Sequence, residues 1–188
     1  MINETIKKNG LTFGVNETIK KNGLTFGVLS GIVSALITST IYAIDLNLFV
    51  SWWIGIVSMV IYLTISIVLL SKTKKELNGV FIFKDAFTTY FISAVIGTLI
   101  GTLFNILLFN VIDPSIQDTL KEITIKNAVE MMQKFNSPAA AINEMIAKMN
   151  ESNPYSVIEL LKGSVYSVLI SSIIGLIMAA FFKSKSQE

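Results

Sequence analysis

Residues 86–112 read AFTTYFISAVIGTLIGTLFNILLFNVI and contain no charged side chain. Small or polar residues recur at every fourth position of this stretch, at Ser93, Gly97, Gly101 and Asn105. The hydrophobic effect does not bring helices together in lipid, because lipid tails are as apolar as leucine. Close packing at small residues does so instead. The stretch therefore predicts a membrane-spanning helix with one flat face on which other helices pack.

The composition of the whole chain is typical of a membrane protein. Of its 188 residues, 52% are hydrophobic and 15% are charged, whereas roughly 25% of the residues in soluble domains are charged. The net charge is only +2 and the lysines are not gathered into one stripe, so we expect no nucleic-acid partner. The chain has neither cysteine nor histidine, which excludes disulfides and thiol chemistry and removes the commonest metal ligand.

Three further uncharged stretches predict three more spans, at residues 22–44, 46–71 and 163–182. The last is just long enough to cross a hydrocarbon core of about 30 Å. The second lacks a row of small residues, so we expect it to be the most lipid-exposed span. The other three spans carry such rows, and we predict that the following residues pack the helices together: Gly27, Gly31, Ala35, Gly97, Gly101, Ser167, Ser171 and Gly175.

The segment between the last two spans, residues 113–162, is more polar and contains the three prolines of the chain. Each follows a residue that caps helices, in Asp113-Pro114, Ser137-Pro138 and Asn153-Pro154. Such pairs mark helix starts, so helices should begin near 114, 138 and 154. The first two helices are expected to form an amphipathic hairpin outside the bilayer, and the third to lead into the last span.

Four methionines of this segment, Met131, Met132, Met145 and Met149, are candidate contacts for a partner. Methionine is flexible and polarisable, which suits an adaptable binding surface. Packing within the hairpin, or contact with the membrane surface, is the alternative interpretation.

The sequence thus predicts an all-α integral membrane protein with four transmembrane helices and an extramembrane helical hairpin between helices 3 and 4. Residues 1–21 would form a cytoplasmic tail and residues 22–183 the membrane domain. Four spans place both termini on one side, which then holds ten of the 15 lysines. The positive-inside rule therefore predicts both termini inside and the hairpin outside, in the periplasm.

Residues 3–15 and 16–28 are identical copies of NETIKKNGLTFGV. On a helix, a shift of this length turns the second copy by about 220° relative to the first, so the copies would not share a face. We interpret the repeat as a duplication or a cloning feature, and we expect the second copy, which leads into the first span, to be the one that matters.

None of the four predicted spans contains an ionisable residue, whereas pumps and voltage sensors depend on such residues. The sequence also lacks phosphate-binding loops, nucleophile elbows and paired metal motifs. We therefore expect no catalytic, cofactor-binding or metal-binding residues and no enzymatic activity.

A resemblance to a known family rests on three features. Phe83-Lys84-Asp85-Ala86-Phe87 opens the third span, an insertion rich in Met, Glu and Lys follows it, and Asn153-Pro154 precedes the last span. Over residues 16–185, this layout resembles a family of Bacteroidota membrane proteins, domain-of-unknown-function family 4199. The resemblance implies four spans with a helical insertion between the last two, and an inner-membrane location. It implies no catalytic or ligand-binding residue.

Two hypotheses for function follow. The first is a non-enzymatic inner-membrane protein, an accessory or structural subunit of a larger assembly, whose hairpin contacts lipid and a protein partner or a second copy of the chain. The alternative is a small transporter or channel for a neutral or lipid-like solute. An exposed apolar stripe on the hairpin would favour the first, and polar residues facing a cavity between the spans would favour the second.

Overall fold

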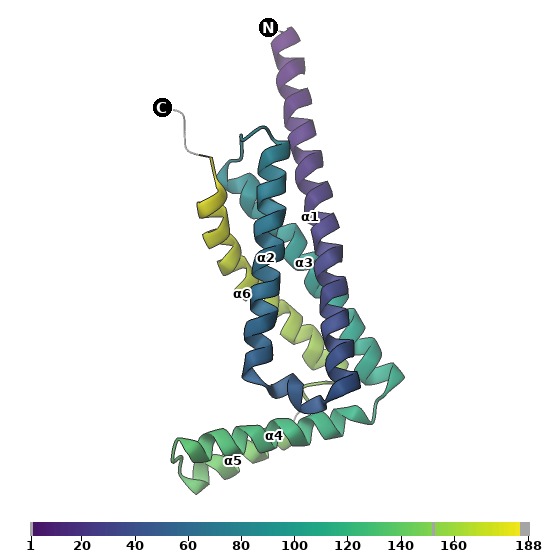
Figure 1. Ribbon diagram of the computed structural model, residues 1–188, viewed down its shortest axis with the longest axis vertical. Coiled ribbons are helices and arrows are strands. Elements are labelled where there is room, and N and C mark those ends of the chain that lie inside the picture. The colour runs from purple at the N-terminus through teal and green to yellow at the C-terminus, as the bar shows by residue number, and fades with distance from the viewer. Residues whose placement is uncertain (1, 152, 185–188) are drawn as a thin grey trace.

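The fold was examined in a computed structural model, which describes residues 2–151 and 153–184, with the side chains of residue 12 and of residues 14 onward (Figure 1). The described part is all-helical, as the sequence predicts. Two short elements, the 3-10 helix η1 (Leu46–Val50) and the π-helix η2 (Leu108–Ile112), accompany six α-helices. These are α1 (Ile2–Ile44), α2 (Trp52–Glu76), α3 (Phe83–Leu107), α4 (Ile116–Lys134), α5 (Ala139–Glu151) and α6 (Val157–Phe182).

Four helical segments are long and apolar enough to cross a membrane: Gly14–Ile44, Trp52–Glu76, Phe83–Ile112 and Val157–Phe182. All four extend past charged residues at which the predicted spans ended. Each extension includes at least one lysine, which can keep its ammonium group in water while its stem lies along an apolar helix. Residues 2–21 are helical and belong to α1, continuous with the first span.

The second span begins later than expected, because residues 46–50 form η1. Asp45 caps this short helix, since its side chain accepts a hydrogen bond from the Asn47 backbone N–H at 2.9 Å. The chain turns here before Trp52 starts α2.

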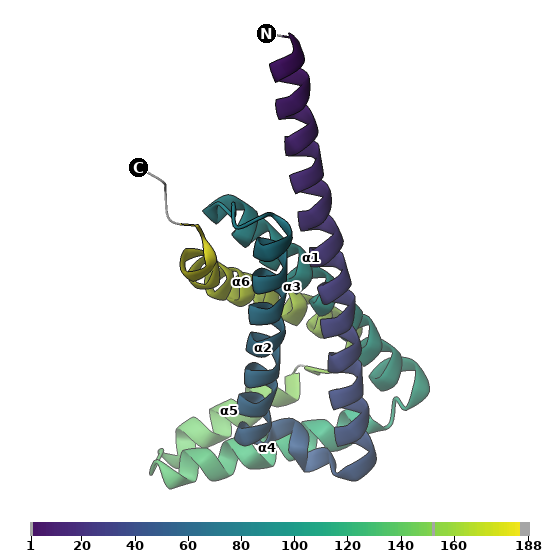
Figure 2. The ribbon, with the colours of Figure 1, turned by 45° about the horizontal axis from the view of Figure 1, so that its top comes forward.

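The most extensive helix–helix contacts in the bundle involve α3, which packs along α1 on one side and α6 on the other (Figure 1). The helix α2 makes smaller contacts with α1, α3 and α6. Both termini lie at the same end of the bundle, and the hairpin of α4 and α5 lies across the opposite end (Figures 1 and 2). We call these the terminal end and the hairpin end.

Two apolar clusters close the two ends of the bundle. At the terminal end, the buried members are Ile19, Leu70, Leu77, Phe81, Ala86, Tyr90, Met178 and Ala179. At the hairpin end they are Leu108, Phe109, Ile116 and Leu120. The terminal end is also tied by paired bonds between Phe81 and Ser184, in which each backbone N–H donates at 2.8 Å to an oxygen of the other residue.

Two helices, α2 and α4, end just before an asparagine. Asn78 and Asn136 both adopt a φ of 53°, the left-handed conformation that asparagine tolerates and that ends a helix. After Asn78, the Gly79 N–H returns to the Lys74 carbonyl at 2.9 Å. After Asn136, the Ser137 N–H returns to the Met132 carbonyl at 3.0 Å. These closures turn α2 toward α3 and α4 toward α5.

Candidate functional site

A cavity of about 390 Å³ lies in the middle of the bundle, between the two apolar clusters. We call it the intramembrane cavity. All four spans contribute to its wall, and most of the lining side chains carry a hydroxyl or an amide group. The polar lining residues are Ser30, Ser34, Tyr62, Ser66, Tyr90, Ser93, Thr98, Thr102, Asn105, Ser167 and Ser171. Among the residues described, the lining contains no charged side chain.

Most of these hydroxyl groups have no hydrogen-bond partner within the described chain. Serine and threonine in helices commonly donate to the carbonyl four residues earlier, and Thr64, Thr89 and Ser172 do so here at 2.7–2.8 Å. In contrast, Ser93 and Tyr90 line the cavity without a partner in the described chain; the residues as a whole are only 6% and 7% exposed, but their hydroxyl oxygens are not enclosed by protein. Because a polar group at membrane depth without a partner is costly, these hydroxyls indicate a cavity that holds water or a polar molecule.

The intramembrane cavity opens sideways, toward the region that lipid would occupy. Met59 of α2 and Ser167 of α6 line it and are themselves exposed, Met59 by 51%. These two helices make few contacts with each other. A molecule dissolved in the bilayer would therefore reach the hydroxyl groups between α2 and α6.

Some of the small residues predicted to pack helices lie at tight helix–helix contacts, whereas others line the intramembrane cavity. Gly27 and Gly31 of α1 face Ile96 and Ile100 of α3, and an added Cβ would lie 2.7 Å and 2.5 Å from the Cβ atoms of these isoleucines. On α3, the corresponding positions meet α1 in turn. An added Cβ at Gly97 would lie 3.0 Å from the Ser30 Cβ, and one at Gly101 would lie 2.6 Å from the Ser34 hydroxyl.

On α6, Gly175 is buried, and an added Cβ there would lie 2.6 Å from the ring of Tyr90. Ser171 lines the intramembrane cavity, as Ser167 does at its open side. Ala35 of α1 is half-buried. The small residues of α1 and α3 thus bring two backbones together, whereas the serines of α6 leave space.

The sequence analysis missed the contribution of α2 to the cavity, because α2 was interpreted as a lipid-facing span. Tyr62 and Ser66 of α2 line the intramembrane cavity. They continue a row that begins with Ser51, Gly55 and Ser58, at spacings of three and four residues. That spacing places all five on one helix face. This small and polar face was the sequence feature that could have predicted the contribution of α2 to the cavity.

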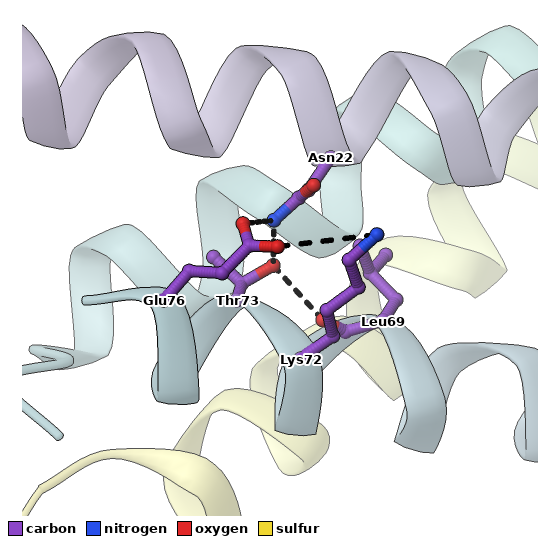
Figure 3. Close-up of polar contacts among 5 residues, drawn as sticks. All are labelled: Asn22, Leu69, Lys72, Thr73 and Glu76. Atoms are coloured by element: carbon purple, nitrogen blue, oxygen red, sulfur yellow. Dashed lines mark hydrogen bonds and ion pairs between the residues drawn. The ribbon is translucent and has the colours of Figure 1, made fainter. Parts of the chain in front are cut away.

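A buried polar contact joins α1 to α2 near the terminal end (Figure 3). The Asn22 side chain, 2% exposed, donates to a Glu76 carboxylate oxygen at 2.6 Å and to the Thr73 hydroxyl at 3.2 Å. Thr73 itself donates to the Leu69 carbonyl at 2.9 Å, and Lys72 lies 3.9 Å from the other Glu76 oxygen. Every polar group of this cluster that is buried therefore has a partner.

Replacing Asn22 by alanine is expected to lower the free energy of unfolding by about 1–3 kcal/mol, the cost of removing a donor from a hydrogen bond to a carboxylate. Thermal unfolding of the purified protein in detergent would measure the change. Asn127→Ala is the matched control, because the exposed Asn127 bonds only to the Ile123 carbonyl of its own helix. Equal unfolding temperatures for the two variants would contradict this role of Asn22.

The hairpin is fixed to the bundle by a network of amide side chains. Gln117 donates to the Phe109 carbonyl of η2 at 2.7 Å and accepts from Asn153 at 2.6 Å. Asn110 donates to the Tyr155 carbonyl at 3.2 Å. Because the last carbonyls of a helix have no donor within the helix, the Gln117 amide satisfies one of them at the end of η2. Both ends of the hairpin are thereby tied to the end of α3.

The four methionines predicted to contact a partner lie on the hairpin. Met131 is 59% exposed, whereas Met132, Met145 and Met149 are half-buried. Phe135, near the tip, is 78% exposed and was not among the predicted contacts.

Two aspartates at the hairpin end, Asp45 and Asp113, have lowered pKa values. Hydrogen bonds from Asn47 lower the pKa of Asp45, and hydrogen bonds from Ser115 and Tyr42 lower the pKa of Asp113. Both side chains therefore remain ionised and act as local caps. In the part of the chain that the structure describes, no three acidic side chains lie close enough together to hold a metal ion.

The fold and the cavity define the class of this protein: an all-helical, multi-pass membrane protein whose four spans surround a cavity lined by uncharged hydroxyl-bearing and apolar residues. Residues 25–184 match the family described as "Protein of unknown function (DUF4199)", and the chain belongs to this family. Comparison with curated proteins and with solved structures gave no match.

Proposed function

We propose that the protein binds an uncharged, hydroxyl-bearing solute or lipid head group in the intramembrane cavity and allows it to cross the membrane without chemical conversion. The observation that carries this proposal is a set of hydroxyl groups, including those of Ser93 and Tyr90, that lack a partner in the described chain and lie on a cavity wall without a charged side chain. Polar residues that face a cavity between the spans are the feature that favours a transporter or channel over an accessory subunit.

The chemistry of the wall restricts the ligand class. A charged ligand at membrane depth would have no opposite charge in the wall and would lose its hydration, which is strongly unfavourable. A neutral ligand with several hydroxyl groups exchanges hydrogen bonds with water for hydrogen bonds with serine and threonine. The volume of about 390 Å³ lies within the usual range for small-molecule pockets, roughly 300–1,000 Å³.

The purified protein in liposomes tests the proposal with two probes. Glycerol uptake, followed by light scattering, reports passage of a free solute, and dithionite reduction of a fluorescent glucosyl lipid reports passage of a neutral head group. We expect at least one rate to exceed that of protein-free vesicles. Ser171→Leu should return it to the protein-free rate, because the leucine side chain fills the cavity.

Thr64→Leu is the matched control. Thr64 is exposed on α2, outside the cavity, and its hydroxyl is satisfied by the Val60 carbonyl, so this variant should keep the wild-type rate. If neither probe moves faster than in protein-free vesicles, the proposal is wrong.

Location and topology are part of the same proposal. In the predicted topology, the side that holds both termini carries ten of the 15 lysines of the sequence, which supports an orientation with both termini in the cytoplasm and the hairpin in the periplasm, in a bacterial inner membrane. No element of the proposed function requires catalysis, a cofactor or nucleic acid.

A second role, as an accessory subunit of a membrane assembly, is favoured by one observation. Met131 and Phe135 form an exposed apolar edge near the tip of the hairpin, where an adaptable contact with a partner protein or a second copy could form. This role requires a protein that co-purifies in mild detergent and is lost when residues 114–152 are replaced by a flexible linker.

A further inference from the structure

A second cavity, of about 380 Å³, lies nearer the hairpin end, and its lining residues come from α1, η1, α2, α3, η2, the turn before α6 and α6 itself. We call it the hairpin-side cavity. Thr38, Ser51 and Ser58 contribute hydroxyl groups to its wall. Asn105 of α3 is the one residue that lines both this cavity and the intramembrane cavity. Asn105 therefore lies in the wall of both spaces.

The Asn105 side chain is held across the bundle by α1. Its amide oxygen accepts a hydrogen bond from the Thr38 hydroxyl at 3.1 Å, and Thr38 is 7% exposed. Within the described chain, the amide nitrogen of Asn105 has no hydrogen-bond partner. A half-buried amide that bonds through its oxygen alone has two donors left for a molecule in either cavity.

The opposite end of the intramembrane cavity is closed differently. Tyr90 lines the cavity and also belongs to the apolar cluster at the terminal end, together with Phe81 and Met178. Its ring lies against α6 at Gly175, where even an added methyl group would collide with it. Opening this end would require several buried apolar side chains to separate, whereas opening at Asn105 would break one hydrogen bond between neutral groups.

We propose that the Thr38–Asn105 pair is the constriction through which the intramembrane cavity exchanges solute with the hairpin side. This inference rests on the proposed function, because it assigns the route between water on the hairpin side and a cavity that also opens toward lipid between α2 and α6. An amide suits the role, since it can both donate to and accept from a passing hydroxyl-bearing molecule while offering no charge to an ion.

Cysteine accessibility tests the constriction, because the chain has no native cysteine. Ser171→Cys reports on the intramembrane cavity and Ser58→Cys on the hairpin-side cavity. The reagents are a positively charged, membrane-impermeant methanethiosulfonate and its small neutral methyl analogue. Labelling of Ser137→Cys, in the hairpin turn, identifies the vesicles whose hairpin side faces the reagent.

We expect the charged reagent to label Ser58→Cys rapidly and Ser171→Cys slowly. Adding Asn105→Ala should accelerate labelling of Ser171→Cys by roughly fivefold to tenfold, the scale set by one hydrogen bond, and leave Ser58→Cys unchanged. Thr38→Val, which removes the bond but keeps the volume, should also accelerate it. Asn127→Ala is the control for an asparagine outside both cavities.

The outcomes separate this inference from the proposed function. If the neutral reagent labels Ser171→Cys but neither Asn105→Ala nor Thr38→Val changes the rate for the charged reagent, the cavity is accessible and the constriction is wrong. If the neutral reagent fails to label Ser171→Cys, the cavity is dry, and the proposed function fails together with the constriction. Monodisperse elution in detergent confirms that each variant is folded.

Discussion

Replacing Gly31 by leucine is expected to prevent α1 from packing against α3 and to abolish the folded bundle. An added Cβ at Gly31 would lie 2.5 Å from the Ile100 Cβ and 2.6 Å from its Cγ2. The Ile100 Cβ is bonded directly to the backbone, so it cannot rotate away and the two helices would have to separate. Overpacking costs about 1–3 kcal/mol even where side chains can adjust, and we expect the loss here to exceed that range.

The measurement is the yield of monodisperse protein in detergent together with its unfolding temperature. Gly163→Leu on α6 is the matched control, because an added Cβ there would have nothing within 4 Å. We expect Gly31→Ala to fall between the wild type and Gly31→Leu, since it introduces the same first clash with less volume. Equal stability of Gly31→Leu and Gly163→Leu would show that this contact does not hold the bundle together.

Replacing Phe109 by alanine is expected to lower the free energy of unfolding by about 3–5 kcal/mol, the usual range for a buried phenylalanine. Phe109 is 2% exposed. Its ring packs edge-to-face on Phe49 and Tyr155, with centroids 5.6 Å and 5.7 Å away. The loss should be concentrated at the hairpin end, because these rings join η1 and the start of α6 to the end of α3.

Thermal unfolding in detergent measures the total loss, and limited proteolysis of α4 and α5 measures whether the hairpin detaches first. Phe181→Ala removes the same ring from a position that is 80% exposed and serves as the control. A hairpin that is cleaved no faster in Phe109→Ala than in Phe181→Ala would contradict the proposed role of this aromatic contact.

The hairpin shows which structural features can be predicted from short sequence motifs and which cannot. Proline after a capping residue predicted helix starts near 114, 138 and 154, and the helices begin at Ile116, Ala139 and Val157. These signals are readable because proline and its neighbour restrict their own backbone angles. The orientation of the hairpin across the bundle end could not be predicted this way, because it depends on contacts between residues far apart in the sequence, of Gln117 with Asn153 and of Phe109 with Tyr155.

The cavity illustrates the opposite case. The small residues of α6 were predicted to pack against other helices in the same way as those of α3. In the fold, Gly175 lies against Tyr90, whereas Ser171 borders open space. Spacing along a helix reveals which residues share a face, but the distance to the facing helix depends on the size of the side chains on that second helix.

The sequence by itself determined the four spans, the hairpin between the last two and the absence of charge at membrane depth, because hydropathy and helical spacing act locally. Tertiary structure decided what each face touches, and the repeated segment demonstrates this. Gly14 and Gly27 occupy the same position in identical copies, yet Gly14 has open space around it and Gly27 lies against Ile96. Identical local sequence thus takes different environments, because contacts depend on where the neighbouring helices begin and end.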